Sequence, residues 1–238
     1  TLEALKRSNE ELEQFAYVAS HDLQEPLRAV VGFLQLLDSR YKDQLDEKGR
    51  HYIARSVNAA QRMQTLISDL LTLSRVTTSD ISFEDTDLNA LFDTAVDNLQ
   101  TAIREKKAAV RRSHLPWLRV DPGQILSLLQ NLISNGIKYN QSEIPIVDVG
   151  CEKRGDVYQL YVRDNGIGID PEFHERIFIL FQRLHTRQEY SGTGLGLALC
   201  KKIIDRHKGR IWVTSQQHQG ATFYIEFPAE GIGHERFD

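Results

Sequence analysis

The stretch FAYVASHDLQEPLRA, residues 15–29, decides the architecture of the N-terminal part of the chain. Apolar residues recur around it at alternating three- and four-residue steps, which defines one heptad register from residue 2 to residue 37. The a positions are 2, 9, 16, 23, 30 and 37, and the d positions are 5, 12, 19, 26 and 33, with Asn9 as a polar exception. We therefore predict a coiled-coil helix over residues 2–40.

His21 falls at the f position of this register, which points away from the seam, and Asp22 follows it directly. Position alone favours a solvated surface histidine. An imidazole can also act as a nucleophile when a neighbouring carboxylate fixes its tautomer. Pro26 follows one turn later, and a proline inside a helix removes a hydrogen bond and usually bends the helix. Both interpretations of His21 remain open at this point.

A second helix is predicted at residues 50–75, after a short polar connection at residues 41–49. Its apolar repeat consists of Ile53, Ala60 and Ile67 at seven-residue intervals, offset by Met63 and Leu70. Two such helices form an antiparallel hairpin. Because one hairpin cannot bury stripes this wide, we expect two copies to pair into a homodimeric four-helix bundle.

Residues 76–80 (VTTSD) interrupt the pattern and are interpreted as a linker between a helical domain, residues 1–76, and a second domain, residues 77–238. The second domain alternates helical and extended patterns, which predicts an α/β sandwich with one mixed sheet covered on one face by helices. Helices are predicted at 88–105, 122–140, 173–179 and 195–207, and strands at 81–84, 108–112, 117–120, 146–153, 157–164, 210–215 and 221–227.

The composition is that of an ordinary globular protein, with 41% hydrophobic and 26% charged residues and a net charge of −4. This charge argues against binding to nucleic acid or to an anionic membrane. Cys151 and Cys200 lie far apart in the sequence and without CxxC spacing, which favours a reduced, cytoplasmic compartment; the alternative is one disulfide between them. There is no run of 18 apolar residues and no signal peptide pattern. Because the sequence opens in mid-heptad, we interpret it as the output portion of a longer protein.

The sequence DPGQ at residues 121–124 predicts a helix start with Asp121 as the N-cap, proline at N1 and Gln124 completing a capping box. One face of this helix carries Asn131, Asn135, Lys138 and Tyr139. Amide oxygens and an ammonium suit a hydrated Mg²⁺ ion bound to phosphates. The alternative is an ordinary solvated face of a helix.

Two glycine-rich motifs follow, DNGIGID at residues 164–170 and GTGLGL at residues 192–197. Asp164 ends a strand, and its carboxylate can accept a hydrogen bond from the amino group of an adenine, although a plain strand-to-helix turn gives the same pattern. Glycines at a helix N-terminus form an anion site, and here they fit neither a Walker A loop nor a dinucleotide fingerprint. The polar segment 183–191 before them, which includes Arg183, suits a lid over a triphosphate.

Taken together, these motifs make the chain resemble the transmitter region of a sensor histidine kinase over essentially its whole length. The matching boxes are SHDLQEPL (20–27), NLISNGIKYN (131–140), DNGIGID (164–170), IFILFQRL (177–184) and GTGLGLAL (192–199). Their wording is most similar to kinases linked to phytochrome or PAS sensors. The resemblance implies a dimerisation and phosphotransfer hairpin followed by an ATP-binding domain of the gyrase, Hsp90, histidine kinase and MutL type.

The resemblance also implies roles for single residues. His21 becomes the phosphoacceptor, and Asp22 the acid that polarises it. Asn135 becomes the main Mg²⁺ ligand with Asn131 in support, and Asp164 the adenine ligand. The other implied nucleotide-binding residues are Lys138, Tyr139, Gly166, Gly168, Arg183, Gly192, Thr193, Gly194, Leu195, Gly196 and Thr222.

We therefore expect Mg²⁺- and ATP-dependent autophosphorylation of His21, transfer to an aspartate of a response regulator, and an upstream sensor domain. Glu25 stands where many relatives with phosphatase activity carry Thr or Asn, and Ile179 where a glutamate is usual, so phosphatase activity and lid docking stay open. Two other functions are a clamping ATPase of the gyrase or MutL type, which has no use for the His-Asp-Pro element, and a dimeric scaffold, against which the intact Asn135 and Asp164 argue.

Overall fold

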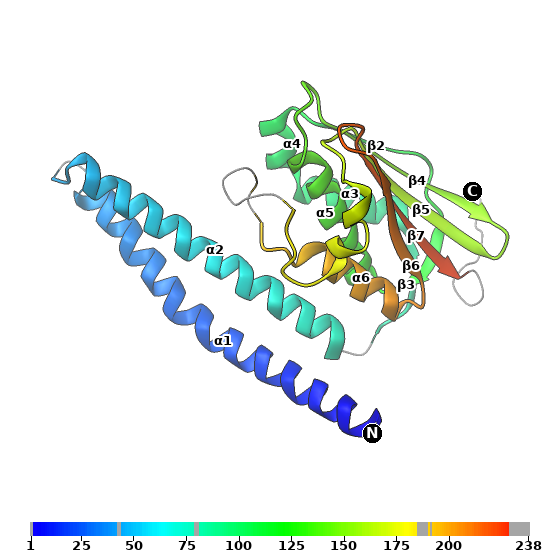
Figure 1. The fold of residues 1–238 in the computed structure, drawn as a ribbon, viewed down its shortest axis with the longest axis horizontal. Coiled ribbons are helices and arrows are strands. Elements are labelled where there is room, and N and C mark those ends of the chain that lie inside the picture. Colours follow the sequence, from blue (N-terminus) through cyan, green and yellow to red (C-terminus); the bar gives the residue numbers. More distant parts are fainter. Residues whose placement is uncertain (1, 42–43, 79–80, 185–189, 191, 229–238) are drawn as a thin grey trace. The chain divides into compact units, whose positions relative to one another are not determined.

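The computed structural model describes residues 2–41, 44–78, 81–184, 190 and 192–228, with the side chains of residues 2–21, 77 and 78 left out. The chain divides into two compact units, residues 1–79 and 80–238 (Figure 1). The first unit is a helical hairpin and the second is an α/β unit, which confirms the predicted fold class. None of the described helices is both long and apolar enough to cross a membrane.

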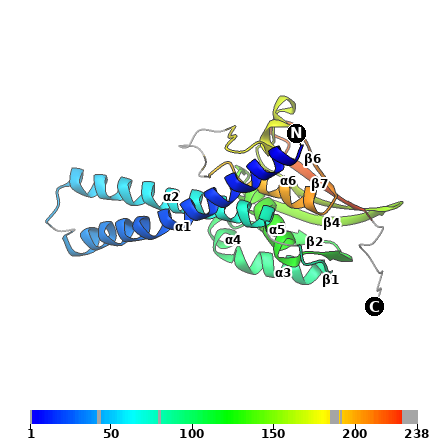
Figure 2. The same ribbon diagram turned by 90° about the horizontal axis from the view of Figure 1, so that it is seen from below.

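The hairpin consists of α1 (Leu2–Tyr41) and α2 (Glu47–Thr78), which lie side by side in both views (Figures 1 and 2). Helix α1 continues through Pro26 as a single element of 40 residues. Helix α2 begins three residues before the predicted start and includes three of the residues predicted as linker. The helical pattern thus extends beyond the apolar repeat at both ends of α2.

Within one chain, α1 packs on α2 with a stripe different from the predicted heptad seam. The stripe Gln24, Leu27, Val31 and Leu34 is buried or half-buried. The a and d residues on the neighbouring stripe stay exposed, with relative exposures of 56% for Leu23, 48% for Val30 and 68% for Phe33. Over residues 22–41, the part of α1 whose side chains the structure describes, the hairpin therefore covers one of two neighbouring stripes and leaves the apolar a and d stripe exposed.

The second unit is built on a five-stranded sheet of order β2–β4–β5–β7–β6. Its strands are β2 (Ala109–Arg112), β4 (Ile146–Arg154), β5 (Val157–Asp164), β6 (Arg210–Ser215) and β7 (Ala221–Pro228). Strand β2 runs parallel to β4 and the other pairs are antiparallel, so the sheet is mixed as predicted. The prediction of one sheet is wrong, because β1 (Glu84–Asp87) and β3 (Trp117–Val120) pair only with each other.

Helices α3 (Leu88–Asn98), α5 (Pro122–Lys138) and α6 (Gly196–Arg206) lie on the same side of this sheet (Figure 1). Successive side chains of a strand point to opposite faces of the sheet, and the side chains on the face toward the helices are buried, including Val147, Leu160, Val213 and Phe227. Helix α5 contributes most to the core, with Ile125, Leu128, Leu129, Leu132 and Ile133 at 1% exposure or less. The polar face of α5 is thereby held in one orientation.

Three further predictions about helices and strands differ from the structure. The helix predicted at residues 88–105 is two helices, α3 and α4 (Gln100–Lys106), because Leu99 has a ψ of 5° and its N–H is shared among the preceding carbonyls. The strand predicted at residues 81–84 begins at Glu84, because its partner β3 sets the register and Phe83 instead packs edge-on against His207. The short helix expected at residues 173–179 is two 3₁₀ turns, Pro171–Phe173 and Arg176–Phe178.

Candidate nucleotide site

Asp164, the last residue of β5, has a carboxylate whose two oxygens differ. Oδ1 accepts hydrogen bonds from the backbone N–H groups of Gly166, at 2.8 Å, and Ala221, at 3.2 Å. Within the described part of the chain, Oδ2 accepts none. Burial raises the pKa of this carboxyl from 3.8 to about 6, against the lowering effect of the two N–H groups. A half-buried carboxylate with one oxygen fixed and the other available suits a ligand that donates a hydrogen bond.

The loop after Asp164 is shaped by glycines that have no room for a side chain. A Cβ on Gly166 would collide with the carbonyl of Tyr139, the residue that caps α5. Gly168 has a φ of +71°, which favours glycine, and a Cβ there would meet the backbone of Gln216. The carbonyl of Tyr139 also accepts the N–H of Ile167 at 3.0 Å. The loop is therefore packed directly on the C-terminal end of α5.

Helix α5 begins as predicted, with Asp121 accepting the N–H of Gln124 at 3.0 Å and proline in the first turn. The capping box is only half formed, because the Gln124 side chain donates to the Asp121 carboxylate and leaves the Asp121 N–H to another partner. The cap and the buried stripe fix where the polar face of α5 points.

The polar face of α5 ends in the groups that the sequence singled out. Asn131 donates its Nδ2 to the carbonyl of Ser127 at 2.9 Å, which orients its oxygen. Lys138 donates to the hydroxyl of Tyr139 at 3.0 Å and lies 4.3 Å from the centroid of that ring. Among the described residues, the Asn135 amide forms no hydrogen bond. Two amide oxygens on one helix face are compatible with Mg²⁺, which prefers oxygen ligands.

The second glycine motif lies against the same face of α5. A Cβ on Gly196, the first residue of α6, would lie 2.5 Å from the Asn131 oxygen, and one on Gly192 would lie 2.7 Å from the Lys138 ammonium. Gly194 has a φ of +76° and its carbonyl accepts the N–H of Phe181 at 3.0 Å. Between them, Thr193 accepts the N–H of the buried Leu195 at 3.4 Å. The glycines thus bring the start of α6 against Asn131 and Lys138.

Arg183 lies at the edge of this arrangement. Its guanidinium donates to the carbonyl of Tyr190 at 2.7 Å, and the Tyr190 ring packs on Tyr139 with centroids 4.9 Å apart. His185 and Arg187, which the sequence also placed in the lid, lie outside the described residues. In the preceding box, Ile177 is buried, whereas most of the later apolar residues remain exposed, with Ile179 at 52% and Phe181 at 61%.

The remaining predicted residues fall in two places. Thr222 lies on β7, paired with Arg163 of β5 and next to the N–H that binds Asp164. His21 and Asp22 lie in α1, in the other compact unit. The side chain of His21 is outside the described residues, and Asp22 is exposed.

Two polar pairs were missed. Asn140 donates to Asn165 at 2.7 Å, and Asn165 also accepts the N–H of Ile146, which fastens the end of α5 to the loop after β5. Ser215 accepts the N–H of Ile169 at 2.8 Å. Asn140 and Asn165 both lie inside the sequence motifs, so their presence there could have indicated a polar contact. Ser215 is an ordinary residue at the end of a strand.

The chemistry of the site follows from these groups. Asp164 offers an acceptor in a half-buried position, α5 offers two amide oxygens and an ammonium, and the glycine motif offers the N-terminal N–H groups of α6. This combination can bind a purine amino group and a chain of phosphates together.

Two family models match the chain. The model described as His Kinase A (phospho-acceptor) domain matches residues 11–79, and the model described as histidine kinase-, DNA gyrase B- and HSP90-like ATPase matches residues 120–231. Together they cover the hairpin and the nucleotide site.

Similar proteins carry related names. Cyanobacterial phytochrome A of Nostoc is 51% identical over 98% of this chain, and phytochrome-like protein Cph1 of Synechocystis is 46% identical over 94%. The chain spans about 30% of the length of each of these relatives. A crystal structure of full-length ShkA in complex with AMPPNP is 25% identical, covers 90% of this chain and 45% of that one, and has a TM-score of 0.70.

Proposed function

Because the chain belongs to the sensor histidine kinases, as a transmitter region with a phosphoacceptor and an ATP-binding domain, we propose that it binds Mg·ATP and phosphorylates His21. The observation that carries the proposal is the Asp164 carboxylate. Two backbone N–H groups hold one oxygen, and the other is available for the 6-amino group of adenine. A hydrogen-bonding pocket of this kind rejects nucleotides that lack the amino group.

The remaining site residues take roles consistent with their surroundings. Lys138 places its ammonium group against Gly192 of the second glycine motif and binds phosphate oxygens. The segment from Gly192 to Gly196 brings backbone N–H groups to the phosphates, with Thr193 and Leu195 setting its turn. Tyr139 and Thr222 border the purine, and Arg183 contacts the γ-phosphate.

Asn135, supported by Asn131, would hold a Mg²⁺ ion through amide oxygens. When bound, the ion would supply positive charge that offsets the charge of the phosphates; phosphoryl transfer is catalysed mainly by positioning and electrostatics. The buried face of α5 keeps both amides on the side where the glycine motif lies.

The phosphoryl transfer is a displacement at the γ-phosphorus. In this step Asp22 would accept a hydrogen bond from the Nδ1–H of His21, which leaves the lone pair of Nε2 to attack, and it would take up the Nδ1 proton as the imidazole gains the phosphoryl group. The Nε2–P bond forms while the bond from phosphorus to the bridging oxygen breaks, and ADP leaves with that electron pair. An aspartate of a response regulator then takes the phosphoryl group in the same type of displacement.

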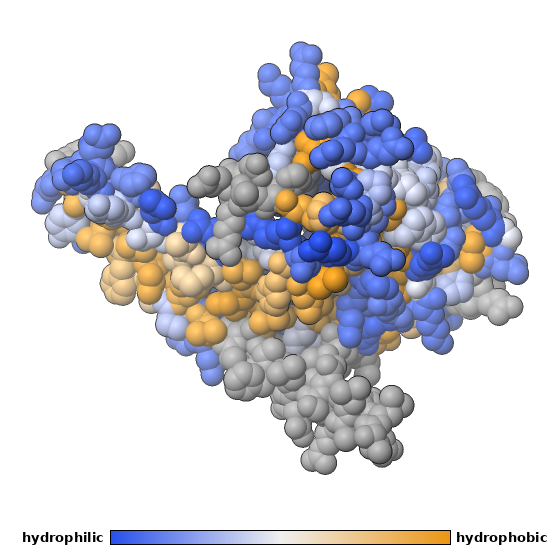
Figure 3. Space-filling model, viewed as in Figure 1, coloured by the Kyte–Doolittle hydropathy of each residue, from blue (hydrophilic) through white to orange (hydrophobic). Residues whose placement is uncertain are grey.

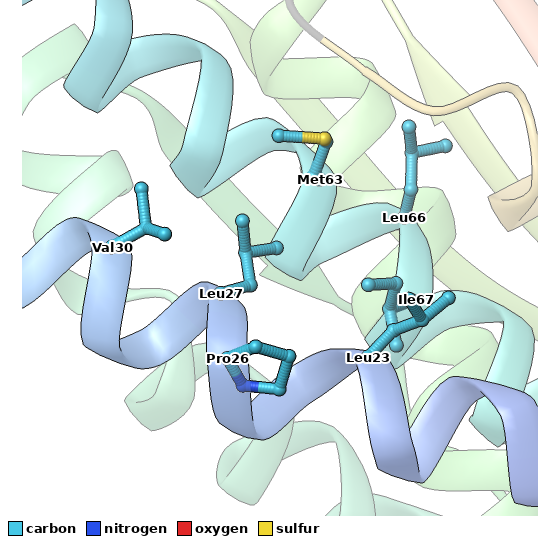
Figure 4. A pocket seen from close by; sticks show the side chains of 7 residues that line it. All are labelled: Leu23, Pro26, Leu27, Val30, Met63, Leu66 and Ile67. Atoms are coloured by element: carbon cyan, nitrogen blue, oxygen red, sulfur yellow. The ribbon is translucent and has the colours of Figure 1, made fainter.

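The hairpin supports a homodimer. One side of it shows a continuous band of hydrophobic side chains (Figure 3). Part of this band forms an open groove lined by Leu23, Pro26, Leu27, Val30, Met63, Leu66 and Ile67 (Figure 4). A second copy can cover the exposed stripe of α1 with its own, giving a four-helix bundle. By analogy with the phytochrome relatives, a sensor of the phytochrome or PAS type precedes α1 and acts through it.

The test is incubation with γ-labelled ATP and Mg²⁺, comparing the natural chain with His21→Gln, Asn135→Ala and Asp164→Asn. We expect a protein-bound label that is labile in acid and stable in base, and that all three variants lose. His21→Gln is expected to keep nucleotide affinity, whereas Asp164→Asn loses it, because the amide must turn its NH₂ either to the backbone donors or to the adenine. Phosphate release without protein label, unchanged in His21→Gln, would instead identify a clamping ATPase.

A further inference from the structure

The turn between β6 and β7, residues 216–220, braces the loop after Asp164. The N–H of His218 donates to the carbonyl of Ile167 at 2.7 Å. The backbone of Gln216 fills the space that a side chain on Gly168 would need. Two segments about 50 residues apart in the sequence are therefore in direct backbone contact.

One side chain joins these two segments, the hydroxyl of Ser215 at the end of β6. It donates to the carbonyl of Gly220 at 2.6 Å, which closes the turn. It accepts the N–H of Ile169 at 2.8 Å, which attaches the loop after Asp164. A hydroxyl can donate once while it accepts, so both bonds form at the same time.

The residues on either side of this junction hold the carboxylate of Asp164. The N–H of Ala221, directly after Gly220, donates to Asp164 Oδ1, and so does the N–H of Gly166 from the loop. Gly220 itself has a φ of +76° and lies against the Asp164 carbonyl, where no side chain would fit. The position of Oδ1 is set from both segments, and the Ser215 hydroxyl fixes those segments relative to each other.

We propose that Ser215 is a positioning residue for adenine recognition. It does not touch the nucleotide. It keeps the turn and the loop at the distance at which the N–H groups of Ala221 and Gly166 both donate to Asp164 Oδ1. The second carboxylate oxygen is then free to accept a hydrogen bond from the amino group of the base. The inference rests on the proposed function, because it concerns the same nucleotide site.

Removing the hydroxyl has a defined consequence. In Ser215→Ala the carbonyl of Gly220 and the N–H of Ile169 both lose their partner, and a polar group left without one inside a protein is costly. The loop and the turn relieve that cost by moving apart, which displaces one of the two donors to Asp164. Ser215→Thr keeps the oxygen and suits a β-strand.

The experiment measures the affinity of the 238-residue chain for two nucleotides by calorimetry in the presence of Mg²⁺. One is ATP, and the other is purine riboside triphosphate, which has hydrogen in place of the 6-amino group. The variants are Ser215→Ala, Ser215→Thr and the control Ser113→Ala, which removes an exposed hydroxyl in the same unit.

We expect Ser215→Ala to raise the Kd for ATP about tenfold, as the loss of one well-formed hydrogen bond predicts. The Kd for the analogue is expected to change less than about twofold, because the analogue makes no bond to Asp164. Ser215→Thr and Ser113→Ala are expected to stay within about threefold of the natural chain for both nucleotides. Amide hydrogen exchange at Ile169 is expected to accelerate in Ser215→Ala alone.

Equal weakening of both nucleotides by Ser215→Ala would overturn the inference, because it would indicate general destabilisation, and so would unchanged ATP binding. A natural chain that binds neither nucleotide, or does not distinguish them, would contradict the proposed function itself. If Ser215→Ala unfolds, two other measurements still test the inference. One compares the nucleotide affinities of Ser215→Thr with those of the natural chain, and the other is hydrogen exchange at Ile169 in the natural chain. Fast exchange at Ile169 in the natural chain would then refute the bond to Ser215.

Discussion

The Nε2 atom of His207 accepts a hydrogen bond from the backbone N–H of Asp121 at 3.1 Å, and so joins the end of α6 to the start of α5. Its Nδ1 donates to the carbonyl of Ile203 at 2.8 Å, since a carbonyl can only accept. The imidazole is therefore neutral with the proton on Nδ1. It is 1% exposed and lies edge-on to Phe83 and Phe227. One buried histidine thus links the two helices of the nucleotide site through its hydrogen bonds.

Replacing His207 by alanine is expected to lower the free energy of unfolding by about 3 kcal/mol, from a cavity beside two aromatic rings and a helix N–H left without a partner. Trp117 and Trp212, the only tryptophans, both lie in the second unit, so urea unfolding followed by their fluorescence reports on this unit. His114→Ala, at an exposed position, is the matched control. Equal stabilities of the two variants would contradict the role of His207.

The pH dependence of this effect has a definite sign. Burial lowers the pKa of His207 below its ordinary value of 6.5. Below pH 6.5 the unfolded chain binds a proton that the folded chain excludes, so the contribution of His207 to stability is complete above pH 6.5 and declines below it. The difference in unfolding free energy between the natural chain and His207→Ala is expected to be smaller at pH 5.5 than at pH 8. A constant difference would mean that the histidine is protonated in both states or in neither.

Asp164 gives a second pH-dependent property, in binding. The pKa of this carboxyl is about 6, and the adenine amino group donates best to its ionised form. ATP affinity is therefore expected to rise with pH up to about 6 and to level off above that value. Below it, the Asp164 carboxylate of the free protein takes up a proton, which weakens ATP binding. Purine riboside triphosphate controls for titration of the phosphates. The same slope for both nucleotides would assign the titration to a group other than Asp164.

Gly196→Ala is expected to weaken Mg·ATP binding about tenfold or more, because its methyl group would push the Asn131 oxygen out of position. The loss is expected to diminish when Mg²⁺ is replaced by EDTA, since the displaced group is an amide oxygen. Gly123→Ala, whose methyl group makes only ordinary contact with Asp121, is the control. Calorimetric titrations at several Mg²⁺ concentrations test this directly. A loss of ATP affinity that does not depend on the Mg²⁺ concentration would indicate that the substitution disturbs the loop alone.

Val30→Glu is expected to convert a dimer into a monomer, because it places a charge in the stripe of α1 that is exposed in one chain. Sedimentation equilibrium measures the mass. Gln35→Glu adds the same charge at an exposed position of the same helix and is expected to stay dimeric. A dimeric Val30→Glu variant would move the interface away from this stripe.

Local patterns were sufficient for much of the fold. The heptads predicted the hairpin, and Asp121 with Pro122 predicted the start of α5, because a cap and its bonds lie within a few residues. The motif glycines were also visible, and the structure packs three of them, Gly166, Gly192 and Gly196, against α5 or its cap.

Contacts across long distances in the sequence were not visible in this way. The N–H of Asp121 was expected to bond Gln124 in a capping box, yet its partner is His207, 86 residues away. The pairing of β1 with β3, which separates them from the main sheet, is also a contact between distant segments that local sequence patterns do not specify. Ser215 has no sequence signal at all, since its importance lies in the carbonyl and the N–H that two other segments bring to it.

The uncovered stripe of α1 links the state of the hairpin to the amount of protein present. If each copy supplies the apolar cover for the other, as proposed, dilution below the dissociation constant removes the cover from both. The hairpin is then expected to lose stability, while the α/β unit, with its own core, is not. The folding of the α-helix that bears His21 then depends on the formation of the dimer. Two protein concentrations would give the same nucleotide affinity per chain and different numbers of histidines able to receive a phosphoryl group.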